Sequence, residues 1–398
     1  MTDGISIGPR LQQLRNAHGM TQRELAERAD VSIDVISKLE RGARHTARLT
    51  TITRLAKALD EDTGSLTGKG NRVERVGDLG VLAVRNAITS PDLLPGLDPD
   101  DDGAPSDPTD LHRQVEKAYG AYFEGEFGAL AAQLPGLLSE CRLTRSAMGP
   151  SSVAAAYAHA YQLAACLLVH VGKDDAALIG AERGMAAATE GDDEYRAATL
   201  SGTYVWILLR MGRYAEAERL AVRTASGIEP TYSTTDPRQL TAWGGQLLHA
   251  AVIAGADERG DEALEYLSRA SAAAARMGSD RHDYWVSFGP SQVAMQRAHV
   301  QVSLDEPDEV LAAAAAVKRS DLFPISWARH SLNVAQALER KRMVDDAIAV
   351  AARAYEISPQ WFRHQQFAAS VISDLVGHKQ RLPRALQTMA STVSTAEE

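Results

Sequence analysis

The sequence predicts an all-α protein, and three observations carry this expectation. Alanine is frequent, only 6% of the residues are aromatic, and apolar side chains recur at helical spacing in successive segments. The hydrophobic fraction of 45% and the charged fraction of 24% are ordinary for a globular protein. At roughly 100–200 residues per domain, 398 residues correspond to two to four domains or one repeat array. A single small module is excluded.

Signals for export, membrane insertion and cysteine chemistry are missing from the sequence. No stretch approaches 18 uninterrupted apolar residues, and the N-terminus lacks a basic region followed by an apolar segment, so we expect a cytoplasmic protein without a membrane partner. Cys141 and Cys166 are too few for a disulfide framework or a cysteine metal site. We expect both to be small buried side chains, and we expect no cofactor and no metal.

The charge is uneven along the chain. Residues 10–57 contain ten basic and five acidic side chains, a local charge of +5 in a protein of net charge −10. The remainder therefore carries −15. This distribution indicates that the N-terminal segment suits a polyanion and that the rest of the chain avoids one.

The segment 9–66 shows short helical patterns separated by turn residues. Thr21 followed by Glu24 forms the T-x-x-E pattern of a capping box, and Ser32 is placed to cap the next helix. Two short helices joined by a three-residue turn are typical of DNA-binding domains in which the second helix enters the major groove. We expect such a domain over residues 1–70.

Residues 20–42, with T-Q-x-E-L-A followed by S-K-x-E-x-G, resemble the helix-turn-helix of the XRE family, which includes lambdoid phage repressors. The resemblance covers about 60 residues and implies a lambda-repressor-like fold. Carried over by position, it implies that Gln22 holds a phosphate oxygen, that five residues face base edges (Ser32, Ile33, Asp34, Ser37, Lys38), and that three lie near the DNA backbone (Arg41, Arg44, Arg48).

The side-chain chemistry agrees with these roles. Asp34 can accept from the exocyclic amine of cytosine, and Lys38 can donate to guanine. Family members often carry Gln where this chain has Ile33, so we expect an apolar contact with a thymine methyl group in place of a bidentate hydrogen bond.

Residues 71–110 are expected to connect the two parts of the protein. An amphipathic segment over 72–89 predicts a helix, which either packs against a neighbour or contributes to a dimer interface. The following segment, 93–109, concentrates proline, glycine and aspartate and is typical of a solvated linker.

Beyond residue 110 the sequence repeats a two-helix unit with a small residue in its second helix. The equivalent positions are Leu130, Ala177, Ala217, Ala263, Val310 and Ala347, separated by 47, 40, 46, 47 and 37 residues. These steps exceed the 34 of a tetratricopeptide repeat (TPR). We expect about six TPR-like hairpins in a right-handed α-solenoid over 111–378, with 361–376 as a solvating cap and 379–398 as a tail that frays from Thr388.

A second resemblance covers the whole chain. A helix-turn-helix domain followed by divergent repeats is similar to actinobacterial regulators, which commonly carry an F-G-P-T-N-V segment, and residues 288–293 read F-G-P-S-Q-V. The plan is distantly similar to the PlcR- and Rgg-like receptors, whose concave TPR face takes a signalling peptide. Ser291 and Gln292 depart from the actinobacterial segment.

The first helices of the hairpins are expected to line that concave face. Polar and aromatic side chains spaced to share a helix face form three candidate ligand-binding rows: Gln239, Trp243 and Gln246; Gln292, Gln296 and His299; Trp327, His330 and Asn333. Amide side chains suit a peptide because they both donate and accept.

The leading hypothesis is a sequence-specific transcriptional regulator, a homodimer on double-stranded DNA at a pseudo-palindromic operator, whose repeat domain senses a peptide or small molecule. The alternative is a TPR interaction adaptor with secondary DNA contact. We expect no enzyme, because no P-loop, G-x-S-x-G, H-E-x-x-H or dinucleotide-binding pattern occurs.

Overall fold

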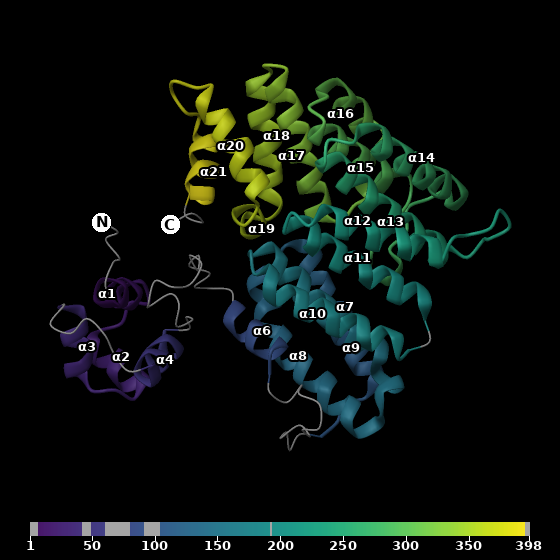
Figure 1. Ribbon diagram of the computed structural model, residues 1–398. Helices are drawn as coiled ribbons and strands as arrows, with labels where there is room; N and C mark the ends of the chain where they lie inside the picture. Colours follow the sequence, from purple (N-terminus) through teal and green to yellow (C-terminus); the bar gives the residue numbers. More distant parts are fainter. Residues whose placement is uncertain (1–6, 42–48, 60–79, 91–103, 192, 395–398) are drawn as a thin grey trace. The chain divides into compact units, whose positions relative to one another are not determined.

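The computed structural model describes residues 7–41, 49–59, 80–90, 104–191 and 193–394 (Figure 1). Over these residues the regular elements are helices, apart from one isolated bridge between Arg281 and Phe288. The expected all-α class is therefore confirmed. Contacts between residues divide the chain into two compact units, with the division between Ala83 and Val84, and we describe each unit by itself.

The N-terminal unit contains four short helices around a small apolar core. They are α1 (Ile7–Ala17), α2 (Gln22–Ala29), α3 (Ile33–Glu40) and α4 (Leu49–Ala58). The core is formed by Leu11, Leu25, Ala26, Ala29, Ile36, Leu39, Leu55, Ala56, Ala58 and Leu59. A 60-residue domain buries little apolar surface, so each contact that fixes its helices contributes a large share of its stability.

Both predicted caps of this unit are confirmed. The Thr21 hydroxyl accepts from the backbone N–H of Glu24, and the Glu24 carboxylate accepts from the Thr21 N–H at 2.7 Å, which completes the capping box. The Ser32 hydroxyl accepts from the Val35 N–H and caps α3. Asp30, in the left-handed conformation (φ 50°), makes the sharp turn between α2 and α3.

A buried ion pair joins the first and third helices. The Arg15 guanidinium makes two hydrogen bonds to the Glu40 carboxylate, at 2.7 and 2.9 Å, and a third to the carbonyl oxygen of Met20. Hydrogen bonding to Glu40 raises the pKa of Arg15 above its ordinary value. Because the pair is bidentate and almost fully removed from solvent, it fixes α3 relative to α1.

The connecting segment is described only as α6 (Val81–Ile88). Val84 and Ile88 are fully buried, and the backbone of α6 is held by Arg142, which donates to the Ala87 carbonyl oxygen, and by Arg183, which donates to that of Ile88. Of the two roles expected for this helix, packing within the chain is the one that these contacts show. The acidic stretch 91–103 lies outside the described residues.

Six helical hairpins follow. They are α7 (Pro108–Glu124) with α8 (Phe127–Met148), α9 (Pro150–His170) with α10 (Asp174–Thr189), α11 (Glu194–Arg210) with α12 (Tyr214–Gly227), α13 (Pro237–Ala256) with α14 (Gly260–Met277), α15 (Pro290–Ser303) with α16 (Pro307–Ala314), and α17 (Pro324–Arg340) with α18 (Val344–Ile357). Successive hairpins stack side by side (Figure 1), which gives the expected α-solenoid.

The repeat alignment predicted from the sequence matches the structure position by position. Each of the six aligned residues is the fourth residue of the second helix of its hairpin, from Leu130 in α8 to Ala347 in α18. All six are buried. Four of the six are alanine, and small side chains allow close helix packing at those positions.

The turns inside the hairpins need one residue with positive φ. Gly172 and Gly212 supply it in the second and third hairpins, each at φ 72°. In the fourth, Gly260 begins α14, and the positive φ belongs to Glu258 (φ 59°). Glu258 therefore adopts a strained conformation in that hairpin.

The helix α9 is long and apolar enough to cross a membrane by length and composition. However, 89% of its apolar window is buried inside the protein. It is a core helix of the repeat unit, packed against α8, α10 and α7.

Two loops from the later hairpins pack against the first one. The loop before α15 contains the short helix η2 (Asp283–Trp285), and its Trp285 stacks on Tyr119 of α7 with ring centroids 4.6 Å apart. Both Tyr284 and Trp285 have positive φ, at 53° and 63°. Phe323, after the short helix η3 (Arg319–Asp321), stacks on Phe123 of α7.

The C-terminal end is more ordered than expected. After α19 (Pro359–Arg363) and α20 (Gln366–Gly377), a further helix α21 (Arg384–Ser394) packs on α18 and α20. Its Leu386, Met389 and Val393 are buried. The expected fraying from Thr388 is thus wrong up to Ser394, and α21 rather than 361–376 is the last helix of the stack.

Candidate functional site

The helix α3 presents the side chains expected to read DNA. Ile33 is 48% exposed. Asp34 and Lys38, one turn apart, form an exposed ion pair with 2.6 Å between Nζ and Oδ2. Ser37 is partly exposed and Arg41 is exposed, and the Arg41 Nε donates to the Ser37 carbonyl oxygen. These side chains share the part of the helix that faces away from the core.

Ser32 and Gln22 are each engaged within the domain. The Ser32 hydroxyl caps α3, which places it at the N-terminal end of the exposed face. The Gln22 amide nitrogen donates to Glu40 at 2.7 Å. Because an amide NH₂ carries two hydrogens, one remains for a phosphate oxygen. The Glu40 carboxylate therefore positions Gln22 directly, and through its ion pair with Arg15 it also positions α3. Arg44 and Arg48 lie outside the described residues.

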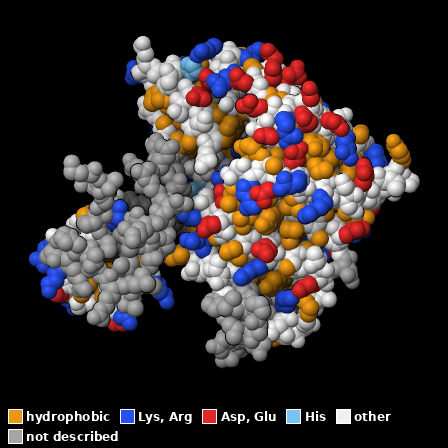
Figure 2. Space-filling model, viewed as in Figure 1, with side chains coloured by type: hydrophobic (Ala, Val, Ile, Leu, Met, Phe, Trp, Pro, Cys, Tyr) orange, Lys and Arg blue, Asp and Glu red, His pale blue; other side chains and the backbone are white. Residues whose placement is uncertain are grey.

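The charge of the described surface follows the sequence. Figure 2 shows Lys and Arg side chains at the surface of the N-terminal unit and acidic side chains gathered over α16 and α18 of the repeat unit. The latter helices begin with acidic first turns, containing Asp308 and Glu309 in α16 and Asp345 and Asp346 in α18. The basic side chains of the N-terminal unit favour a polyanion.

The first candidate ligand row is used for helix packing. Trp243 lies in the apolar core between α13 and α14, and Gln246 is only 1% exposed. The Gln246 amide donates to the Ala198 carbonyl oxygen at 2.6 Å and to the Ser201 hydroxyl, and Gln239 donates to the Ile228 carbonyl oxygen. These amides hold neighbouring helices together.

The second and third rows meet where α15 packs against α17. His299 accepts a hydrogen bond from Arg329, with 3.4 Å between Nε2 and Nη2, and Asn333 lies one turn beyond Arg329. Gln292 and Asn333 each carry a buried amide oxygen without a hydrogen-bond partner. His330 is buried against Trp327, and Gln296 is partly buried.

Burial dominates the titration of these histidines. It lowers the pKa of His299 to about 3, with the Arg329 charge as the second cause, and lowers the pKa of His330 to about 4. Both imidazoles are therefore neutral at physiological pH.

The predicted site residues did not include Arg329 or a set of hydrogen-bonded polar side chains from several hairpins and the C-terminal helices. Tyr122 and Gln365 both contact His170, at 3.1 Å from Nε2 and Nδ1 respectively. Tyr119 donates to Gln162, which in turn donates to Thr203, linking α7, α9 and α11. The position of Arg329 four residues before Asn333 was a signal of a shared face, but nothing in the sequence indicated that its charge lacks a partner.

The segment 288–293 has a structural role. Phe288 is fully buried over Gly244, where a Cβ atom would lie 2.0 Å from the phenyl ring. Asp280 accepts from the backbone N–H groups of Ser291 and Gln292 and so caps α15. The Ser291 hydroxyl donates to Asp321, which ties the two loops together.

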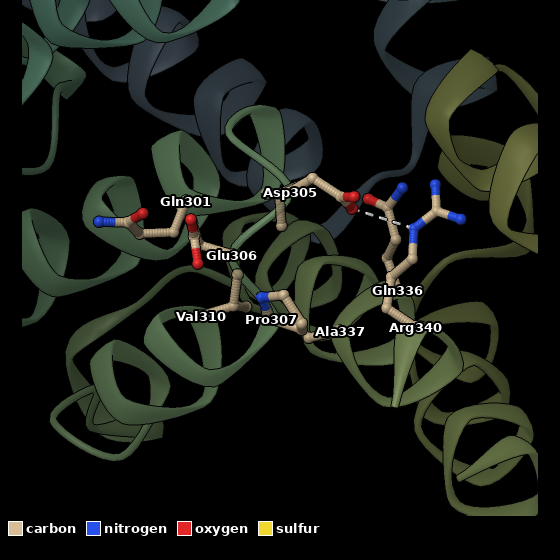
Figure 3. Close-up of a pocket in the computed structure, with 9 residues that line it drawn as sticks. Gln301, Asp305, Glu306, Pro307, Val310, Gln336, Ala337 and Arg340 are labelled. Carbon is tan, nitrogen blue, oxygen red and sulfur yellow. Dashed lines mark ion pairs between the residues drawn. The ribbon is translucent and has the colours of Figure 1, made fainter. Parts of the chain in front are cut away.

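A small pocket opens at the turn between α15 and α16 and the C-terminal half of α17 (Figure 3). Gln336 and Arg340 line it, with Arg340 paired to Asp305 at 3.2 Å. Its volume of about 10 Å³ is roughly the space of one water molecule, so it does not hold a ligand of ordinary size. Among the described residues, no group of three or more His, Cys, Asp or Glu is placed to hold a metal ion.

Comparison with known proteins identifies the N-terminal unit. Residues 11–66 match the helix-turn-helix family, which confirms the expected XRE-type DNA-binding domain. Among curated proteins, none matches the chain in sequence.

Several solved structures are similar to the chain over most of its length. Bacillus thuringiensis PlcR, solved with the peptide PapR7 and DNA, is 13% identical with a TM-score of 0.36, covering 87% of this chain and 99% of that chain. The competence regulator ComR from Streptococcus vestibularis, in its apo form, is 12% identical with a TM-score of 0.31, covering 82% and 97%. At these values neither assigns a function to this chain.

Proposed function

We propose that the protein is a sequence-specific transcriptional regulator that binds double-stranded DNA through α3. The observation that carries this proposal is the exposed face of α3 within a helix-turn-helix domain. Ile33 lies in solvent beside Asp34 and Lys38, while Arg15 and Glu40 hold the helix rigidly from behind. An exposed apolar side chain between groups that donate and accept suits base edges in the major groove.

We propose further that the regulator binds as a homodimer. One domain of this size makes few base contacts, so two copies with recognition helices about 34–36 Å apart would meet a pseudo-palindromic operator. Determination of the molar mass in solution, free and on DNA, tests this state. A monomer under both conditions contradicts it.

The repeat domain is proposed to sense a peptide or small molecule. Buried polar atoms without partners destabilise a folded protein unless something satisfies them. Gln292, His299, Asn333 and Gln336 supply such atoms on α15 and α17, two helices that pack against each other. A bound effector would satisfy groups of this kind.

Selection of bound fragments from host genomic DNA tests the DNA-binding proposal. The full-length protein is compared with a K38A/R41A variant and with R213A, which removes an ion-paired arginine just before α12 in the repeat domain. The proposal predicts discrete sites for the wild type and R213A, and loss of those sites for K38A/R41A. Retention of the sites by K38A/R41A would contradict the role of α3.

A further inference from the structure

Arg329 is a deep guanidinium without a carboxylate partner. Its Nη2 lies 3.4 Å from His299 Nε2, and its Cζ lies 4.7 Å from the ring centroid of Phe367. No described Asp or Glu lies within ion-pair distance of it. Burial, and secondarily the charge of Arg210, lowers the pKa of Arg329 to about 10, so the group remains charged at neutral pH. An unpaired charge in this position is costly to the folded protein.

Three other arginines of the repeat domain have a carboxylate partner. Arg145 pairs with Glu190, Arg210 lies 3.5 Å from Asp174, and Arg259 pairs with Glu218. The chain thus supplies a carboxylate to these guanidiniums and leaves Arg329 without one.

Two buried donors near Arg329, the His299 Nδ1–H and the Asn333 amide nitrogen, also lack acceptors. Because a guanidinium only donates, His299 must accept at Nε2 and carry its proton on Nδ1, which is buried without a partner. Asn333 is 1% exposed and lies close enough to His299 to influence its pKa, yet neither of its amide atoms makes a hydrogen bond of normal geometry. Arg329 and His299 both keep partial solvent access.

Resting on the proposed sensing function, we propose that Arg329, with Asn333 and His299, binds a carboxylate group of the effector. A planar carboxylate accepts two parallel hydrogen bonds from a guanidinium and a further one from the amide. One positive charge beside a neutral imidazole balances a monoanion, whereas a phosphate dianion would leave excess negative charge. The carboxylate is that of a peptide C-terminus or of a small organic acid.

Thermal unfolding of the full-length protein with small probes tests the site. The probes are N-acetyl-Ala-Leu-Leu with a free C-terminus, its C-terminal amide, benzoate and inorganic phosphate, at 20 mM and equal ionic strength. For a dissociation constant of about 1 mM, the free carboxylate should raise the unfolding temperature by roughly 3 °C or more. The amide should raise it by less than 1 °C.

Three variants make the test specific. R329Q should melt no lower than the wild type without a probe, because it removes an uncompensated charge, and should lose the response. N333D should place a carboxylate beside Arg329, raise the unfolding temperature and also lose the response. R340Q, on the same helix but paired with Asp305, should keep the response.

The outcomes distinguish a peptide C-terminus from other carboxylates, and they separate the carboxylate site from the proposed DNA binding. Stabilisation by the tripeptide alone assigns a peptide C-terminus, and stabilisation by benzoate as well assigns carboxylates in general. Equal stabilisation by the amide, stabilisation by phosphate alone, an unchanged response in R329Q, or no response to any probe overturns the proposal. Since the readout does not involve DNA, the site can succeed or fail independently of operator binding.

Discussion

Ser358 donates a hydrogen bond of 2.8 Å to the carbonyl oxygen of Gly125, which joins the last hairpin to the first across 233 residues. The same hydroxyl accepts from the Trp361 N–H and caps α19. Near it, Gln360 accepts from the Gly128 N–H. The solenoid therefore closes on itself, and its first and last hairpins stabilise each other.

Loss of this contact should be measurable. Ser358→Ala leaves the Gly125 carbonyl and the Trp361 N–H without a partner and should lower the free energy of unfolding by about 1–2 kcal/mol. Urea titration measures the change, with S303A as the control, since exposed Ser303 bonds only within its own helix. An equal effect of both substitutions would show that the contact between the first and last hairpins contributes nothing to the free energy of unfolding.

The Arg15–Glu40 pair should be essential to the N-terminal domain. Arg15→Met leaves a buried carboxylate unpaired and should destabilise the domain by about 3 kcal/mol or more, enough to unfold much of it. Circular dichroism of the full-length chain on heating should show an early transition that is absent from the wild type. R23M is the matched control, because Arg23 and Glu27 form an exposed pair. Similar melting of both variants would contradict the role of the buried pair.

The strained turn at Glu258 offers a stabilising substitution. Glu258→Gly should raise the free energy of unfolding by roughly 0.5–1 kcal/mol, because glycine adopts positive φ without steric cost. The reciprocal change, Gly172→Glu in the second hairpin, should lower it by about 1 kcal/mol. Denaturant midpoints report both changes. A loss of stability in E258G would show that the Glu258 conformation carries no strain.

Acid should weaken the repeat domain before most carboxylates titrate. Burial lowers the pKa of His159 and of His330 to about 4, against about 6.5 in the unfolded chain. Between pH 4 and pH 6.5 the unfolded chain binds more protons than the folded chain. The free energy of unfolding therefore falls as the pH decreases from 6.5 to 4, by about 3 kcal/mol for each histidine. Urea midpoints at pH 7.5, 6 and 5 measure the slope.

A substitution isolates this effect. His330→Leu should reduce the pH dependence by the contribution of this one histidine, whereas H112L, at an exposed position of α7, should leave it unchanged. An unaltered slope in H330L would contradict the assignment.

The helix caps and the repeat positions were predictable from the sequence. The capping box at Thr21, the cap at Ser32 and the six aligned repeat positions depend on short-range patterns, and the structure confirms them. The helix α21 could also be predicted from the sequence, because Leu386, Met389 and Val393 follow helical spacing. Its position along the chain, beyond the last repeat, instead indicated a tail.

Long-range packing was not predictable. The stacking of Trp285 on Tyr119 and the isolation of Arg329 depend on how distant hairpins meet, which no periodicity encodes. Trp243 and Gln246 have the spacing of a ligand face, yet neighbouring helices cover them. Spacing gives the face of a helix but not what lies opposite.

Binding of the full-length protein to its selected genomic fragment, as a function of salt, tests sequence-specific DNA binding through α3 most directly. We expect a discrete pseudo-palindromic site that the protein binds with much higher affinity than bulk DNA at 200 mM salt. K38A/R41A should lose binding to this site, and R213A should keep it. Non-specific phosphate binding falls steeply with salt, so it cannot imitate this result. Diffuse binding that disappears between 50 and 200 mM salt, equally for all three proteins, would contradict a sequence-specific regulator.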